Sequence, residues 1–136
     1  MNLTFLNHAS YILNIGNSNI LFDPYLYGSA FNNGWKLLNE EEHDVTNVNY
    51  IFYSHEHPDH FQVDFLKKNF TNNREQVTIL YQETYDKRIK TFCTKLGYSF
   101  IAVRLAALSS PVSKSILLTP AITAISIAVN NWVFFW

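Results

Sequence analysis

The chain contains a single cysteine, Cys93, so no disulfide can form within it. A lone thiol fits a reducing compartment. The first residues also lack the basic segment followed by an apolar segment that marks a secretory signal peptide. These two absences predict a cytoplasmic protein. Cys93 falls on the apolar side of a predicted helix, which indicates packing rather than chemistry.

An excess of positive charge is also absent. The chain has 10 Lys and Arg against 11 Asp and Glu, a formal net charge of -1, which gives no electrostatic basis for binding nucleic acid. The sequence is instead rich in apolar residues, with 48% hydrophobic, 16% aromatic and 15% charged side chains. These values are typical of a globular protein rather than a disordered one. A length of 136 residues is enough for one domain with a moderate core.

Acidic residues and histidines are missing from the later part of the chain. No acid follows Asp86 and no histidine follows His60, and the helical periodicity of the earlier sequence stops after about residue 103. We therefore divide the chain into a domain over residues 1–103 and an atypical apolar tail over residues 104–136. We hypothesise that a shifted reading frame or a truncated gene produced the tail, which the two other frames of the DNA would test.

The tail allows two further interpretations. Residues 115–136 carry no charge and approach the length of a membrane span, which favours a membrane anchor, although Pro120 and several polar residues oppose it. The second interpretation is a pair of apolar strands that cover the domain, for example through dimerisation. The sequence leaves the oligomeric state open.

Apolar periodicity predicts an α+β protein. The predicted order is strand 3–6, strand 11–15, strand 20–22, irregular loop 25–49, strand 50–53, helix 61–70, strand 76–81, helix 85–96 and strand 98–103. Residues 16–19 have turn chemistry and make the second and third strands a hairpin. Thr84 is the predicted N-cap of the second helix, and Gly97 is the predicted residue just after its end.

Three of the five histidines fall within the segment HEHPDH at residues 55–60. His55 and His57 are two apart at the end of a strand, so their side chains point the same way and can share one metal. Asp59 and His60 are adjacent where the chain turns into a helix, and they must point differently, which suits a second metal nearby. Histidine and carboxylate are usual ligands for zinc, with iron or manganese as alternatives. A set of surface histidines in a loop is the other interpretation.

This motif after an apolar strand resembles the metallo-β-lactamase superfamily. The segment NHAS at 7–10, together with Asp23-Pro24, resembles the subgroup of L-ascorbate-6-phosphate lactonases and N-acylphosphatidylethanolamine phospholipases. The stretch 23–35 is similar to the lactamase-like domains of the CMP-sialic acid hydroxylase group. The resemblance covers about residues 3–103. It implies the N-terminal half of an αββα sandwich, with a dinuclear site at one edge between the sheets.

The resemblance also implies roles for the motif residues. His55 and His57 match ligands of the first metal, and Asp59 and His60 match ligands of the second. Asp59 in addition matches a catalytic residue that orients the bridging water or shuttles its proton.

Four further residues have a functional and a structural interpretation. Asp23 matches a buried acid that holds the metal loop through hydrogen bonds, and the alternative is a turn aspartate before proline. His8 matches a family position near the site, and the alternative is a satisfied polar group at a strand end. Phe31 and Trp35 either contact substrate or anchor their loop on the core.

A complete site of this kind implies three more ligands from the C-terminal half: a histidine for the first metal, a bridging aspartate and a histidine for the second metal. The chain offers no histidine after His60, so these ligands are missing. The residues that could be recruited instead are His8, His43, Asp64, Glu75, Glu83 and Asp86. Asp64 lies on the predicted helix after the motif, where a solvated residue of the helix face is a better explanation than a metal ligand.

These observations predict a metal-dependent hydrolase, with zinc as the metal and up to two ions per site. Metal-bound hydroxide would attack an ester, lactone, amide or phosphodiester, in a site that is incomplete in this chain. The alternative is a non-catalytic remnant or a metal-binding module, associated with a membrane through its tail. The expected partner is a small-molecule substrate, and the likeness to the hydroxylase group suggests a sugar or a sugar-nucleotide.

Overall fold

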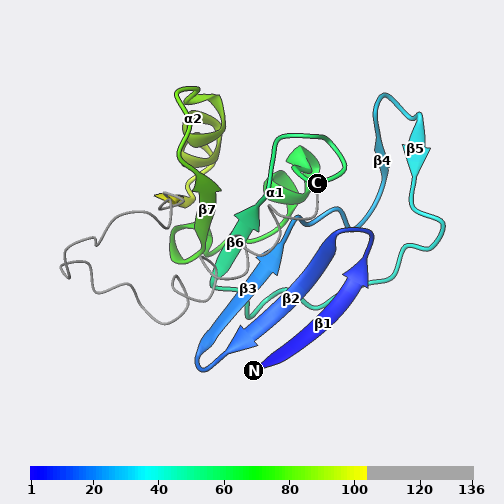
Figure 1. Ribbon diagram of the computed structural model, residues 1–136, viewed down its shortest axis with the longest axis horizontal. Helices are drawn as coiled ribbons and strands as arrows, with labels where there is room; N and C mark the ends of the chain where they lie inside the picture. Colours follow the sequence, from blue (N-terminus) through cyan, green and yellow to red (C-terminus); the bar gives the residue numbers. More distant parts are fainter. Residues whose placement is uncertain (104–136) are drawn as a thin grey trace, which may run out of the picture. The chain divides into compact units, whose positions relative to one another are not determined.

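A six-stranded sheet in the order β1-β2-β3-β6-β7-β8 organises residues 1–103, which are the part of the chain that the computed structural model describes (Figure 1). Its strands are β1 (Asn2–Asn7), β2 (Ser10–Ile15), β3 (Ser18–Phe22), β6 (Tyr50–Tyr53), β7 (Thr78–Gln82) and β8 (Ser99–Val103). The first three strands are antiparallel neighbours, and the pairs β3–β6, β6–β7 and β7–β8 are parallel. The carboxyl ends of β3 and β6 therefore meet at one edge of the sheet.

Helices connect two of the three parallel strand pairs, β6–β7 and β7–β8, as a β-α-β-α-β order requires. Helix α1 (Val63–Lys68) and the 3₁₀ turn η1 (Arg74–Gln76) link β6 to β7, and helix α2 (Arg88–Lys95) links β7 to β8. The strands β4 (Ser29–Ala30) and β5 (Trp35–Lys36) form a small separate hairpin, which Figure 1 shows projecting away from the main sheet. The predicted α+β class and the predicted order of the main elements are confirmed.

The helix-covered face of the sheet holds the core. Its buried strand residues alternate along the chain, as side chains on one face of a strand must, and they pack against buried side chains of both helices. They include Leu21, Ile51, Tyr53, Ile79 and Tyr81 from the strands, Phe65 and Leu66 from α1, and Cys93 from α2. This packing fixes β3 and β6, whose ends position the candidate site.

The opposite face of the sheet is also apolar. Cross-strand pairing aligns one apolar residue from each of the six strands in a single row: Phe5, Tyr11, Phe22, Phe52, Leu80 and Ile101. Phe5 is 69% exposed and Ile101 is 40% exposed at the two ends of this row. A sheet that is apolar on both faces belongs to a layered fold, as the predicted half-sandwich requires.

Three local predictions are wrong. Residue Gln76 belongs to η1 rather than to a strand, and the loop 25–49 contains the β4–β5 hairpin. Thr84 does not cap α2, because the helix starts later and Asp86 Oδ1 accepts the backbone N–H of Arg88 at 2.8 Å. The prediction for the other end of α2 holds: Gly97 has φ +97°, and Tyr98 N donates to Cys93 O across the helix end.

The predictions for residues 104–136 lie outside the described residues. These are the shifted frame, the membrane anchor and the covering strands. Within residues 1–103, no helix has both the length and the apolar character needed to cross a membrane.

Candidate metal centre

Asp23 and Ser54 occupy the ends of the neighbouring strands β3 and β6. The backbone N–H of Asp23 donates to Phe52 O at 2.9 Å, which extends the strand pairing past the end of β3. The Asp23 carboxylate then accepts two hydrogen bonds from Ser54, one from its backbone N–H at 2.7 Å and one from its hydroxyl at 2.6 Å. Asp23 is 4% exposed. The start of the metal motif is therefore fixed to the strand beside it.

His60 is oriented by the same carboxylate. Its Nδ1 lies 3.0 Å from Asp23 Oδ2. Because an ionised carboxylate only accepts hydrogen bonds, Nδ1 carries the proton in the neutral ring, and Nε2 keeps a lone pair. That Nε2 faces Asp59 Oδ2 at 3.5 Å. Asp23 thus directs Nε2 of His60, the candidate metal-binding nitrogen, toward Asp59.

The motif itself folds into a tight turn. His60 N and Phe61 N both donate to His57 O, at 2.9 and 2.7 Å, and this turn precedes α1. His55 Nε2 and His57 Nδ1 lie 3.1 Å apart. Two ligand atoms of a tetrahedral zinc, with bonds of about 2.1 Å, lie about 3.4 Å apart. The two nitrogens are therefore spaced as two ligands of one metal would be.

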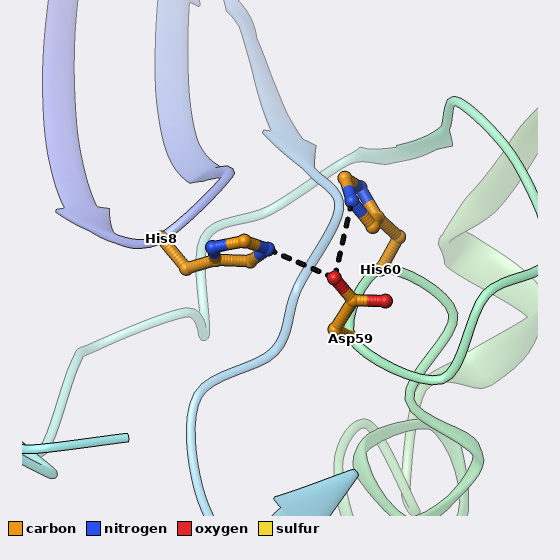
Figure 2. A group of neighbouring side chains, drawn as sticks. All are labelled: His8, Asp59 and His60. Atoms are coloured by element: carbon orange, nitrogen blue, oxygen red, sulfur yellow. Dashed lines mark hydrogen bonds and ion pairs between the residues drawn. The ribbon is translucent and has the colours of Figure 1, made fainter. Parts of the chain in front are cut away.

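Asp59 lies between two imidazoles. His8, from the turn between β1 and β2, places Nε2 at 3.1 Å from Asp59 Oδ2, and His60 approaches the same oxygen (Figure 2). The ligand atoms of His8, Asp59 and His60 all lie within 4.8 Å of one another. Asp59 Oδ1 is buried and has no hydrogen-bond partner among residues 1–103. A buried carboxylate oxygen without a partner is costly, and a bound cation would satisfy it.

The two histidine pairs form one continuous cluster. The rings of His55 and His57 are 4.6 Å apart, those of His55 and His60 are 4.0 Å apart, and those of His8 and His60 are 5.3 Å apart. All six residues predicted for the site are therefore brought together, and this donor set suits a transition metal. Among the described residues, the other recruitable side chains join no such group: His43, Asp64, Glu75, Glu83 and Asp86.

The cluster shifts the pKa of two histidines in opposite directions. Burial, aided by the charge of His60, lowers the pKa of His55, which favours the neutral, metal-binding ring. Burial also acts to lower the pKa of His60, but the hydrogen bond and charge of Asp23 and the charge of Asp59 outweigh it and raise that pKa. A metal that binds His60 therefore competes with a proton on the ring, which the charges of Asp23 and Asp59 stabilise.

An aromatic wall, made of Tyr25, Phe31 and Trp35, borders the cluster. Trp35 stacks on Tyr25 with ring centroids 5.6 Å apart, and its ring lies 4.5 Å from that of His8. The ring centroid of Phe31 lies 6.4 Å from that of Trp35 and 6.5 Å from that of His57. Phe31 is 51% exposed and Trp35 is 37% exposed. The wall therefore offers aromatic surface to solvent beside the candidate metal ligands.

Left-handed backbone recurs around the site. His8, Asp23 and Phe31 have φ of 41°, 38° and 51°. This conformation is uncommon for residues other than glycine, and for a bulky side chain such as phenylalanine it carries strain. Strain of this kind is common at functional sites, and all three residues border the cluster, although the same conformation also occurs away from it, at Phe70 with φ 54°.

Sequence reasoning assigned no role to two serines. Besides binding Asp23, Ser54 Oγ lies 2.8 Å from His55 Nδ1. Ser10 Oγ, which is buried, donates to Asp23 O at 2.7 Å and accepts from Tyr25 N at 3.0 Å. The signal for Ser54 was its position between a buried strand and the motif, where parallel strands end together.

Comparison with known proteins bears on the family of the chain. A family model described as a beta-lactamase superfamily domain matches residues 2–112. Cytidine monophosphate-N-acetylneuraminic acid hydroxylase of Xenopus laevis is 37% identical over 86 residues, which are 60% of this chain and 14% of that protein. The inactive human cytidine monophosphate-N-acetylneuraminic acid hydroxylase is 40% identical over 70 residues, 48% of this chain and 14% of that protein. The chain thus spans only a small part of these relatives.

A solved structure supports the same fold. The crystal structure of a possible metal-dependent hydrolase from Veillonella parvula DSM 2008 matches with a TM-score of 0.54 and 21% identity. The match covers 74% of this chain and 41% of that one. The family model covers most of the chain, and the predicted family is confirmed. The chain belongs to the beta-lactamase superfamily.

Proposed function

We propose that the chain acts as a metal-dependent hydrolase, with zinc as the metal and iron or manganese as alternatives. The observation that supports this most is Asp59, whose carboxylate is flanked by imidazoles on one oxygen and is buried without a partner on the other. Among the buried side-chain atoms of residues 1–103 that have no hydrogen-bond partner, Asp59 Oδ1 is the only carboxylate oxygen, and leaving such an oxygen without a partner is especially costly.

The residues divide into two sets of ligands. His55 Nε2 and His57 Nδ1 would hold one metal, because these atoms face each other at 3.1 Å. Asp59 and His60 Nε2 would hold the other. Asp23 and Ser54 fix the rings through the opposite nitrogens, Nδ1 of His60 and Nδ1 of His55. Orientation of this kind raises the basicity of the ligating nitrogen.

When bound, a metal of this class lowers the pKa of water to about 7 and polarises the bond to be hydrolysed, which suits an ester, lactone, amide or phosphodiester. The protein's own proton acceptor would be Asp59. Its carboxylate lies between His8 and His60 in the cluster, where it would orient a water or take its proton.

For the substrate we propose a small molecule with a sugar or sugar-nucleotide ring. The hydroxylase relatives are named for a cytidine monophosphate sugar, and the aromatic wall provides exposed ring surface beside His57 and His8. Sugar and base rings both pack well on aromatic faces.

A second candidate function is a metal-binding module without turnover, or a remnant. It is favoured by the small donor set of the cluster: among residues 1–103, the histidines that reach it are His8, His55, His57 and His60. Such a chain would bind metal weakly and catalyse nothing.

The two functions separate in one experiment. The full chain is loaded with zinc or manganese and assayed on p-nitrophenyl acetate and bis(p-nitrophenyl) phosphate, alongside His57→Ala and the control His43→Ala. Turnover that His57→Ala abolishes and His43→Ala retains supports the hydrolase. Bound metal without turnover supports the module, and neither metal nor turnover supports the remnant.

A further inference from the structure

We infer that His8 is a direct ligand of the cation held by Asp59 and His60, so that the turn between β1 and β2 completes a three-residue metal site. The inference rests on the proposed metal-binding function and adds a ligand to it. His8 is the only histidine outside the motif that reaches the cluster among the described residues.

The three side chains converge from two separate parts of the fold. His8 follows β1, whereas Asp59 and His60 lie in the turn after β6, some fifty residues later. Figure 2 shows the His8 ring directed edge-on at the Asp59 carboxylate, with His60 approaching the same oxygen from a different direction. Two nitrogens and one carboxylate oxygen within 4.8 Å form a donor set that zinc and related metals accept.

The Asp59 carboxylate independently points to a cation. Both imidazoles approach Oδ2, at 3.1 and 3.5 Å, while Oδ1 is buried and has no partner among residues 1–103. If His8 served only to satisfy Asp59 by a hydrogen bond, the second oxygen would still be unsatisfied. A cation held by the carboxylate and the two nitrogens would balance the charge of this partly buried carboxylate, which a hydrogen bond from His8 alone does not do.

The surroundings of His8 hold its ring toward the site. The residue adopts φ 41°, where an L-residue is strained, in a turn whose pairing register shifts between Phe5 and Asn7. Trp35 packs edge-on against the ring at 4.5 Å, and Tyr25 lies 6.5 Å away. A strained backbone and an aromatic neighbour that both direct one imidazole at a carboxylate are features of a ligand that has been prearranged.

The competing role is a positioning residue, in which His8 only donates a hydrogen bond to Asp59. The variant His8→Gln separates the two roles, because a glutamine amide can still donate to a carboxylate but cannot replace an imidazole nitrogen as a ligand. Loss of an outer hydrogen bond costs about 10- to 100-fold in metal affinity. For a direct ligand we expect about 100-fold or greater loss in both His8→Ala and His8→Gln, and no loss in His43→Ala.

The decisive experiment is NMR of the full chain loaded with an NMR-active cadmium isotope and labelled at the histidine nitrogens. The expected result is scalar coupling from one cadmium to ring nitrogens of both His8 and His60, with the His8 signal lost in His8→Gln. Coupling to His60 without coupling to His8, or wild-type affinity in His8→Gln, overturns the inference and leaves the metal site intact. Absence of coupling to every histidine of the motif overturns the inference together with the proposed function.

Discussion

Asp23 and Ser54 are joined by two hydrogen bonds, of 2.7 and 2.6 Å, that tie the end of β3 to the start of the metal motif. The same carboxylate reaches His60 Nδ1 at 3.0 Å. One buried acid therefore sets both the path of the motif and the orientation of His60, one of its candidate ligands.

Replacement of Asp23 by asparagine should weaken metal binding without unfolding the chain. The amide offers one accepting oxygen in place of two and removes the charge near His60, so we expect about 10- to 100-fold lower zinc affinity. Isothermal titration of zinc measures this. Asp44→Asn is the control. The Asp44 carboxylate also accepts hydrogen bonds, from Thr46, but it is exposed. Equal zinc affinity in Asp23→Asn and the wild type would contradict the role of Asp23.

The two faces of the sheet region should respond differently to loss of a phenyl ring. Phe65 is fully buried under the sheet, so Phe65→Ala should lower the free energy of unfolding by about 3–5 kcal/mol. Phe5 is 69% exposed, so Phe5→Ala should lower the free energy of unfolding by less than about 1 kcal/mol. Denaturation in urea measures both values. A larger loss for Phe5→Ala than for Phe65→Ala would mean that the core lies on the other face.

Cys93 should be chemically inert while the chain is folded. Burial raises the pKa of its thiol to about 12, and the side chain is 0% exposed. In the unfolded chain the pKa is about 8.5, so the unfolded state loses its proton first and stability falls as pH rises above that value. Ellman's reagent at pH 8 should react only after urea is added. Rapid reaction in buffer alone would place Cys93 at the surface.

The aromatic wall should contribute to ligand binding. Trp35→Ala removes the ring that contacts both Tyr25 and His8, so affinity for cytidine monophosphate or N-acetylneuraminate should fall about 5- to 150-fold, in line with stacking of about 1–3 kcal/mol per ring. Equilibrium dialysis with the zinc-loaded chain measures it. Tyr85→Ala, which removes a fully exposed aromatic ring, should bind like the wild type. Equal binding by Trp35→Ala would assign the wall to loop anchoring.

Much of the fold was predictable because it follows from local pattern. Alternation marked β2, an apolar run after a turn marked β3, a compact apolar run marked β6, and the spacing of Phe65 and its neighbours marked α1. The motif at residues 55–60 was recognisable because its donor residues lie close together in the sequence. Membership of the superfamily followed from that motif and its flanking stretches.

The remaining features depend on tertiary structure. The β4–β5 hairpin turns through three consecutive left-handed residues, Phe31, Asn32 and Asn33, which no propensity rule favours for phenylalanine. The contact of His8 with Asp59 spans fifty-one residues of sequence and exists only once β1, β2 and β6 are assembled. Thr84 was wrongly predicted as a cap because Asp86, two residues later, is the better acceptor for the first helical N–H.

Native mass spectrometry of the full chain in the presence of zinc tests the central claim, that the motif holds metal, most directly. The account predicts up to two zinc ions per chain, one fewer in His57→Ala, and none in a variant that combines His57→Ala with Asp59→Asn, while His43→Ala binds as the wild type does. A wild-type chain that takes up no zinc, or a double variant that takes up as much as the wild type, would contradict it.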